Sequence, residues 1–235
     1  MPNRRVLISP KAQAIQAERQ DEAQAVKTLE GLRARPDGGK EETARFLAGA
    51  IQRALDSGIA PPTWVRSQIS LSQPHSALVP ALVALLKTGD PFAAATLGDD
   101  LGPVAAGAVP TLREALTHDS EHMRAYAAGA LGSIGRAAEP ALGDLLKSAK
   151  DPEEWVRSNA LGAIRKIGPT VDCLPVLIEA LQDASPVVRE HSALALSRLG
   201  TSARDAVPGL KKLAAGGDAR VFVAAKAALA AIEHS

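Results

Sequence analysis

The sequence is poor in aromatic residues and contains a single cysteine. Phenylalanine, tryptophan and tyrosine together make up only 3% of the 235 residues. The lone Cys173 excludes an internal disulfide and a cysteine-rich metal site, and it fits a reducing compartment. A core with few rings must consist mainly of Ala, Leu, Val and Ile, and Ala and Leu are strong helix formers. The composition therefore favours helices over sheets, which prefer β-branched and aromatic residues.

The sequence also lacks a strong net charge and long apolar runs. Its net charge is +1, so no whole-molecule field attracts it to nucleic acid. The longest apolar run, Ala77–Leu86, is too short to span a bilayer. The run Val6–Ile8 near the start is too short for a secretory signal. We therefore expect a cytoplasmic protein that acts away from membranes.

A motif recurs along the chain at an almost constant spacing. The segment "DPEEWVRSNALGAIRKIG" (Asp151–Gly168) is repeated 32 residues later as "DASPVVREHSALALSRLG" (Asp183–Gly200). Related segments precede it, in "EHMRAYAAGALGSIG", and follow it, in "ARVFVAAKAALAAIE". Repeats of this length are the signature of stacked supersecondary units.

Each repeat predicts two helices, which we call A and B. Helix A is predicted where a proline precedes apolar residues three and four apart, as in "VPALVALLK" from Val79 and "LPVLIEALQ" from Leu174. Helix B has a buried stripe of period 3.6. The stripe of the best-defined copy consists of Val156, Ala160, Ala163, Ile164 and Ile167. Its small residues should let neighbouring helices approach closely.

Start and stop signals flank helix B. Asp90-Pro91, Asp151-Pro152 and Ser185-Pro186 each read as an N-cap followed by the first helical residue. A glycine in the left-handed conformation is expected after the last apolar residue. These glycines are Gly102, Gly135, Gly168 and Gly200.

The pattern Asp-x-x-x-x-Val-Arg-x-x-Ala-x-x-x-(Leu/Ile)-x-x-(Leu/Ile)-Gly resembles the HEAT-repeat family, in particular the short HEAT-like repeats of the phycobilin-lyase type. The resemblance covers about residues 75–233. It implies an all-α fold, a right-handed α-solenoid of stacked antiparallel helix pairs with a curved binding face. HEAT arrays act mostly as scaffolds and adaptors, so the resemblance does not imply one activity.

Three regions are predicted along the chain. Residues 1–38 form an N-terminal helical extension or arm, with one helix expected over 11–33. Residues 39–73 form a degenerate capping repeat, because "TWVRS" repeats part of "EWVRS" and solenoids need atypical end units. Residues 74–235 form a HEAT-like array of about five helix pairs.

No catalytic or metal constellation is predicted. His118 and His122 are four residues apart, as zinc ligands on one helix face would be, but a turn and the lack of a third ligand argue against a metal. The HEAT-like deoxyhypusine hydroxylases use His-Glu pairs, whereas Glu190-His191 has the reverse order. Cys173 is interpreted as a small buried side chain. We expect no cofactor.

Two polar columns run through the B helices. Arg124, Arg157 and Arg189 form the first, and with Asp151 and Asp183 we interpret it as a structural ladder in which each Asp caps helix B and pairs with an arginine. The alternative is a basic ladder for phosphate or an acidic peptide. The other column consists of Tyr126, Asn159 and His191, and it would touch a partner if helix B lines the concave side, as the resemblance implies. Lys166 and Arg198 form a modest basic patch near the end of helix B, for which simple solvation is the alternative. The candidate partner-binding residues are Tyr126, Asn159, His191, Trp155, Lys166 and Arg198.

The leading functional hypothesis is a non-enzymatic scaffold or adaptor that binds another protein or peptide on a curved surface. A tetrapyrrole (bilin) lyase or chaperone-like subunit is the first alternative, motivated by the resemblance alone. The second alternative is a nucleic-acid-binding array, against which the near-neutral net charge argues. The partner's identity and the oligomeric state stay open at this point.

Overall fold

The computed structural model describes residues 10–35, 39–72 and 75–233, and within these ranges it contains helices and no strands. The chain divides into two compact units, Met1–Gln73 and Pro74–Ser235. The fold is an all-α solenoid, as the repeat pattern predicts. Residues 1–9 and 36–38 of the predicted N-terminal arm, and the last two residues of the array, lie outside the described residues.

The first unit consists of α1 (Pro10–Arg33), α2 (Lys40–Asp56) and α3 (Thr63–Ser70). The predicted helix over 11–33 is therefore confirmed. α2 packs against both α1 and α3. The core of this unit is aliphatic, because its largest fully buried side chains are Leu29, Leu47, Ile51 and Ile69. That residues 39–73 derive from a worn repeat stays a prediction.

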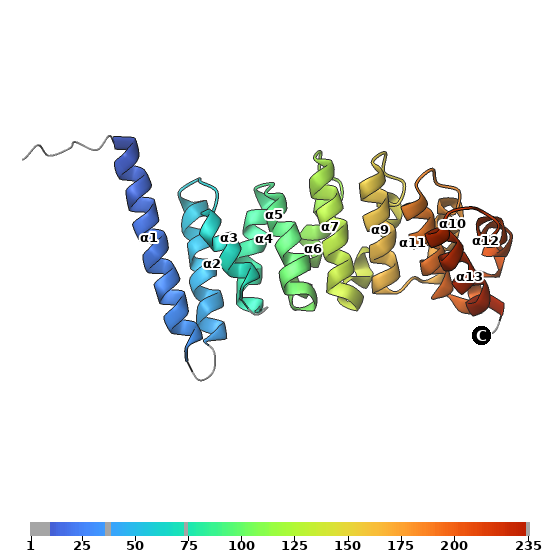
Figure 1. Ribbon diagram of the computed structural model, residues 1–235, viewed down its shortest axis with the longest axis horizontal. Helices are drawn as coiled ribbons and strands as arrows, with labels where there is room; N and C mark the ends of the chain where they lie inside the picture. The colour runs from blue at the N-terminus through green and yellow to red at the C-terminus, as the bar shows by residue number, and fades with distance from the viewer. Residues whose placement is uncertain (1–9, 36–38, 73–74, 234–235) are drawn as a thin grey trace, which may run out of the picture. The chain divides into compact units, whose positions relative to one another are not determined.

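The second unit alternates A and B helices, and successive B helices lie side by side (Figure 1). Contacts run from α5 to α7, from α7 to α9, from α9 to α11 and from α11 to α13. The A helices are α4 (Val79–Lys87), α6 (Val109–Ala115), α8 (Leu142–Ser148), α10 (Leu174–Ala180) and α12 (Val207–Ala214). The B helices are α5 (Pro91–Thr96), which continues into a π-helical turn at Leu97–Leu101, α7 (Glu121–Ile134), α9 (Glu154–Ile167), α11 (Pro186–Ser197) and α13 (Ala219–Glu233).

The predicted caps of the B helices are partly right. Asp90 caps α5 by accepting a hydrogen bond from the Phe92 amide at 3.0 Å, and Ser185 caps α11. The prediction for Asp151 is wrong, because the N-cap of α9 is Glu153. Asp151 lies two residues earlier and accepts the Glu153 amide at 3.0 Å. Asp183 likewise accepts the Ser185 amide, at 2.8 Å, so each Asp organises the turn before the helix and leaves the cap to another residue.

The glycines that end the B helices do have positive φ, as predicted. The φ values are 52° at Gly102, 73° at Gly135, 113° at Gly168 and 52° at Gly200. The expected left-handed helical conformation is wrong for Gly102, Gly135 and Gly168, because their ψ values of −126°, −140° and 107° lie far outside that region. Only glycine adopts these combinations readily.

Two further glycines allow the B helices to approach closely. A Cβ atom on Gly98 would lie 2.7 Å from the Cα atom of Ala130, and one on Gly132 would lie 2.8 Å from the Cα atom of Ala163. Both distances are shorter than van der Waals contact, so the π-helical turn after α5 approaches the backbone of α7 closely, and α7 approaches that of α9. The small residues of the buried stripe therefore serve as the sequence suggested.

Candidate functional site

The candidate site lies on α7, α9 and α11, on a surface that we call the helix-B face. We define this face by the residues His122, Tyr126, Gly129, Trp155, Asn159, Gly162, Arg165, Lys166 and His191. The three helices pack in this order, so equivalent positions of successive repeats become neighbours. Residues three and four apart share one side of a helix, which explains why Trp155, Asn159 and Gly162 lie together.

An aromatic cluster occupies one part of the helix-B face. The ring centroid of Trp155 lies 5.2 Å from that of Tyr126 and 5.4 Å from that of His122, and both pairs are nearly perpendicular, at 81°. Such edge-to-face pairs are favourable beyond the area they bury. Trp155 nevertheless keeps 41% of its surface exposed. The cluster thus holds a large ring in one orientation while leaving much of it open to a partner.

Hydrogen bonds on α9 fix the side chains next to this cluster. The Asn159 Nδ2 atom donates to the carbonyl oxygen of Trp155 at 2.9 Å, and the Ser158 hydroxyl donates to the same oxygen at 3.0 Å. The Asn159 Oδ1 atom consequently points toward α7, where it would lie 3.3 Å from a Cβ atom on Gly129. Asn159 therefore presents a hydrogen-bond acceptor to the helix-B face.

Beside the cluster, glycines on α7 and α9 leave a pocket of about 130 Å³. The His191 ring covers one side, because a Cβ atom on Gly162 would lie 3.8–3.9 Å from three of its ring atoms. Arg165 and Lys166 also line the pocket. Burial, followed by the positive charge of Arg165, lowers the pKa of His191, so this imidazole is neutral near pH 7. The pocket therefore combines two fixed positive charges with a histidine that can gain a third.

The Arg and Asp column forms a ladder away from this face. Arg157 donates from Nε and Nη2 to the two carboxylate oxygens of Asp183, at 2.9 and 3.1 Å. Its Nη1 atom donates to the carbonyl oxygens of Asp151 and Pro152, at 3.0 and 2.9 Å. Arg124 repeats the pattern with Asp151, at 2.8 and 3.0 Å. Each arginine thus fastens the turn of its own repeat to the aspartate of the next.

The ladder leaves little capacity for another ligand. The hydrogen bond with Asp183 raises the pKa of Arg157 despite burial, and the same interaction with Asp151 raises that of Arg124. Burial alone would raise the pKa of Asp183, but hydrogen bonds from Arg157 and the Ser185 amide hold it below its usual value. Guanidinium groups already committed to a bidentate carboxylate are poor sites for phosphate.

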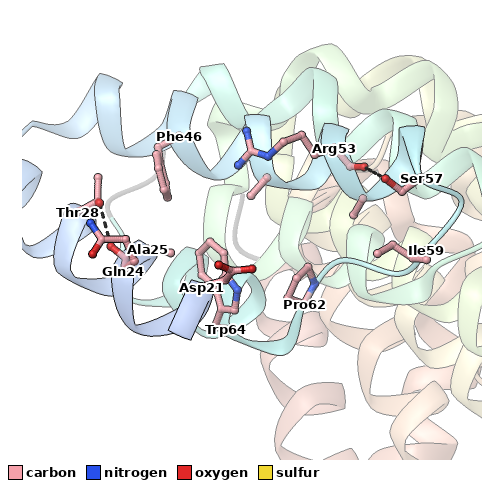
Figure 2. Close-up of a pocket in the computed structure, with 12 residues that line it drawn as sticks. Asp21, Gln24, Ala25, Thr28, Phe46, Arg53, Ser57, Ile59, Pro62 and Trp64 are labelled. Carbon is pink, nitrogen blue, oxygen red and sulfur yellow. Dashed lines mark hydrogen bonds between the residues drawn. The ribbon is translucent and has the colours of Figure 1, made fainter. Parts of the chain in front are cut away.

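A second hollow, of about 480 Å³, lies within the first unit, between α1, α2 and the start of α3. Figure 2 shows Phe46 and Trp64 lining it, together with Ala25, Pro62 and polar groups at its rim. The ring centroids of Phe46 and Trp64 are 6.4 Å apart. The Phe46 side chain is only half-buried, because it borders this hollow.

Comparison with known families now accounts for the repeats. Residues 140–231 match the family model described as HEAT repeats, and residues 92–134 match the model described as a HEAT-like repeat. The chain contains HEAT repeats. Neither description specifies the phycobilin-lyase type, so that narrower resemblance stays a prediction. A search of curated proteins gave no match.

Several solved structures with a similar fold are described as engineered or designed proteins. One engineered protein is 24% identical, with a TM-score of 0.60 over 91% of this chain and 96% of that chain. A designed armadillo repeat protein in complex with the peptide (KR)4 is 20% identical, with a TM-score of 0.59 over 88% and 98%. Another, described as designed for modular peptide recognition, is 21% identical, with a TM-score of 0.58 over 89% and 99%. At these identities the likeness shows the fold alone.

The HEAT repeats bring together five of the six predicted partner-binding residues. Tyr126 and Trp155 lie in the aromatic cluster, Asn159 lies between the cluster and the pocket, and Lys166 and His191 line the pocket. Arg198 follows the end of α11; it is exposed and does not line the pocket. That these residues bind a partner stays a prediction.

The sequence pattern did not reveal two parts of the site, nor the separate hollow in the first unit. His122 was considered only as a metal ligand, although its helical position one turn before Tyr126 could have placed it in the aromatic cluster. Gly129 and Gly162 recur at the repeat spacing, and this signal could have revealed the pocket. The hollow beside Trp64 had no such signal, because its lining comes from helices that do not repeat one another.

In residues 10–35, 39–72 and 75–233, no three His, Cys, Asp or Glu side chains are grouped as a metal ion would require. Cys173 is buried, and its sulfur lies 3.7 Å from the Thr170 hydroxyl. Over the same ranges, no helix combines the length and the apolar character that a bilayer crossing demands.

Proposed function

We propose that the HEAT repeats form a protein-interaction module that binds a segment of another protein on the helix-B face, with Trp155 as the anchor. The observation that carries this proposal is the half-exposed Trp155, held between Tyr126 and His122 in a protein that has few aromatic residues. Partially exposed tryptophans and tyrosines on rigid supports are the residues that contribute most to protein interfaces. The role is that of a scaffold or adaptor that works without catalysing a reaction.

The geometry of the face supports a peptide-like ligand. Aromatic rings at one part of it offer apolar contact, the Asn159 Oδ1 atom can accept an N–H bond, and Arg165 and Lys166 can meet carbonyl or carboxylate oxygens. These groups lie on helices that are already formed, so binding loses little conformational entropy. The designed armadillo repeat proteins with the same fold are described as peptide binders, which is compatible with this use.

The proposal is tested by selecting binders from a displayed library of random peptides on the whole chain. We then compare their enrichment on the wild type, on Trp155→Ala and on Phe222→Ala. Phe222 is a matched control, because it is an aromatic residue of the same unit with 40% exposure and lies outside the helix-B face. Removing an interface anchor costs about 2 kcal/mol or more, so we expect at least a thirtyfold loss of affinity for Trp155→Ala.

Loss of binding in both variants, or in neither, would contradict the assignment of the face. A triple variant, Tyr126→Ala with Asn159→Ala and His191→Ala, extends the test across α7, α9 and α11. We expect it to abolish the enrichment while its circular dichroism spectrum stays helical. A folded triple variant that binds as well as the wild type would place the partner elsewhere.

A further inference from the structure

Resting on the proposed function, we infer that the pocket on the helix-B face is a carboxylate-binding subsite, which selects partner segments carrying an acidic group next to a backbone amide. The pocket lies among α7, α9 and α11 and has a volume of about 130 Å³, enough for a carboxylate and its attached methylene. Its lining contains the cations Arg165 and Lys166 and no carboxylate. The remaining lining is small or neutral, and much of it is glycine, so a side chain can enter between the helices.

Unpaired nitrogen atoms at the pocket support an anionic ligand. Within the part of the chain that the structure describes, the Arg165 Nε and His191 Nδ1 atoms are buried and form no hydrogen bond. This contrasts with Arg157, whose guanidinium group makes four. A buried donor such as the Arg165 Nε–H destabilises the protein unless something else satisfies it, and the His191 Nδ1 atom is a donor once the ring is protonated. An anion drawn between Arg165, Lys166 and His191 would supply the missing acceptor.

The charges that surround His191 have a positive balance. The pKa of His191 is lowered by the positive charges of Arg165, Arg220 and Lys166, and it is raised by the negative charge of Glu190. Glu190 is already paired with Arg220, at 2.9 Å, which weakens its effect on the pocket. A bound carboxylate would offset these positive charges and raise the pKa of His191. Binding should therefore take up a proton, and the affinity for the carboxylate should rise as the pH falls from 8 to 6. The carboxylate itself stays ionised over this range.

The Asn159 side chain favours a carboxylate in a peptide over an inorganic anion. Its Nδ2 atom is used by the Trp155 carbonyl, so the acceptor Oδ1 atom faces the pocket side of α7. That oxygen would repel sulfate or phosphate, but it can accept the backbone N–H next to an acidic group. Both an acidic side chain and a chain terminus place an amide N–H beside a carboxylate.

Small-molecule probes test the subsite without any knowledge of the partner. N-acetylglutamate α-amide carries a side-chain carboxylate, N-acetylglycine carries a terminal one, and N-acetylglutamine amide is the neutral analogue. Each is titrated into the isotopically labelled whole chain at pH 6 and pH 8, with sulfate as a fourth probe. The histidine ring signals are followed by NMR, and the exposed His118 serves as an internal reference.

We expect saturable shifts of His191 with at least one carboxylate probe, a higher pKa of His191 in the complex and no response to the neutral amide. The two carboxylates distinguish a side chain from a terminus. Losing one charged hydrogen bond should weaken binding about tenfold in Lys166→Gln and Arg165→Gln. Lys211→Gln, which removes an exposed charge on α12, should bind like the wild type. Lys166 is exposed, so its variant is expected to fold even if Arg165→Gln does not.

The inference is overturned if no carboxylate gives a saturable shift, if the neutral amide shifts His191 equally, if sulfate alone binds, or if Lys211→Gln loses affinity as much as Lys166→Gln. This failure is distinct from that of the proposed function. If the probes fail while Trp155-dependent peptide selection succeeds, the module binds its partner without the subsite. If the probes bind while selection fails, the subsite exists but the peptide-binding role is wrong.

Discussion

Replacing Arg157 by methionine tests whether the Arg and Asp ladder holds the HEAT repeats together. The change keeps much of the aliphatic stem and removes the guanidinium group that joins the Asp151 turn to Asp183. Two charge-assisted hydrogen bonds at about 1.5 kcal/mol each amount to about 3 kcal/mol. Breaking a buried pair costs about 3–5 kcal/mol. We use the lower end because Arg157 and Asp183 retain 17% and 14% exposure.

The free energy of unfolding in urea measures this loss, and a double-mutant cycle with Asp183→Asn isolates the pair. We expect a coupling energy of about 2 kcal/mol, within the range found for directly bonded residues. The control is the ion pair between Lys150 and Glu179, which also joins successive repeats but keeps 53% and 65% exposure. Exposed pairs of this kind contribute about 0.5 kcal/mol, so its cycle should be nearly additive.

The contribution of the Arg157 and Asp183 pair to stability should also depend on pH in a definite direction. Because the folded state holds the pKa of Asp183 below its unfolded value, the ionised carboxylate stabilises the fold. Its contribution should be complete above the unfolded pKa of about 4 and should disappear as the pH falls through the folded pKa. A coupling energy below about 0.5 kcal/mol at pH 7, or equal coupling in the Lys150 and Glu179 pair, would refute the reasoning.

Two further predictions concern the glycines and His191. Gly132→Ala should destabilise the protein by about 1–2 kcal/mol, because overpacking against the Ala163 backbone outweighs the better helix propensity of alanine. Gly143→Ala should stabilise the protein by about 0.5–1 kcal/mol, because the space around Gly143 is open. Changes of the same sign in the urea unfolding of the two variants would contradict the packing argument. The free energy of unfolding should fall between pH 7 and pH 5, because the unfolded state protonates more readily than the buried His191. His191→Gln should reduce this slope, and an unchanged slope would show that His191 does not cause it.

The fold was predictable because its determinants are local and repeated. The apolar stripe of Val156, Ala160 and Ile164 defines a helix by spacing alone, and its recurrence shows that each helix packs on its equivalent in the next repeat. Helix starts were less predictable, because Asp151 has the side chain of an N-cap residue. The structure uses its carboxylate for the turn and for Arg124 instead, a choice that depends on the neighbouring repeat.

The candidate site was predictable only in part, for a related reason. The column of Tyr126, Asn159 and His191 could be identified because it repeats at a constant spacing. The pocket beside it depends on missing side chains, at Gly129 and Gly162, and on how far apart two helices settle. The size of such a pocket depends on packing between helices, which the sequence pattern of one helix does not specify.

The ladder stops short of the C-terminal end of the array. Arg189 donates to the carbonyl oxygens of Asp183 and Ala184, but no carboxylate of the described residues pairs with it, so the α12 and α13 pair lacks this fastening. The two complete rungs connect α7, α9 and α11, the same helices that carry the aromatic cluster and the pocket, and they do so from the roughly opposite side of each helix. Twisting or stretching of the superhelix should therefore concentrate in the outer repeats, while the distance between Trp155 and His191 stays almost constant as the molecule flexes.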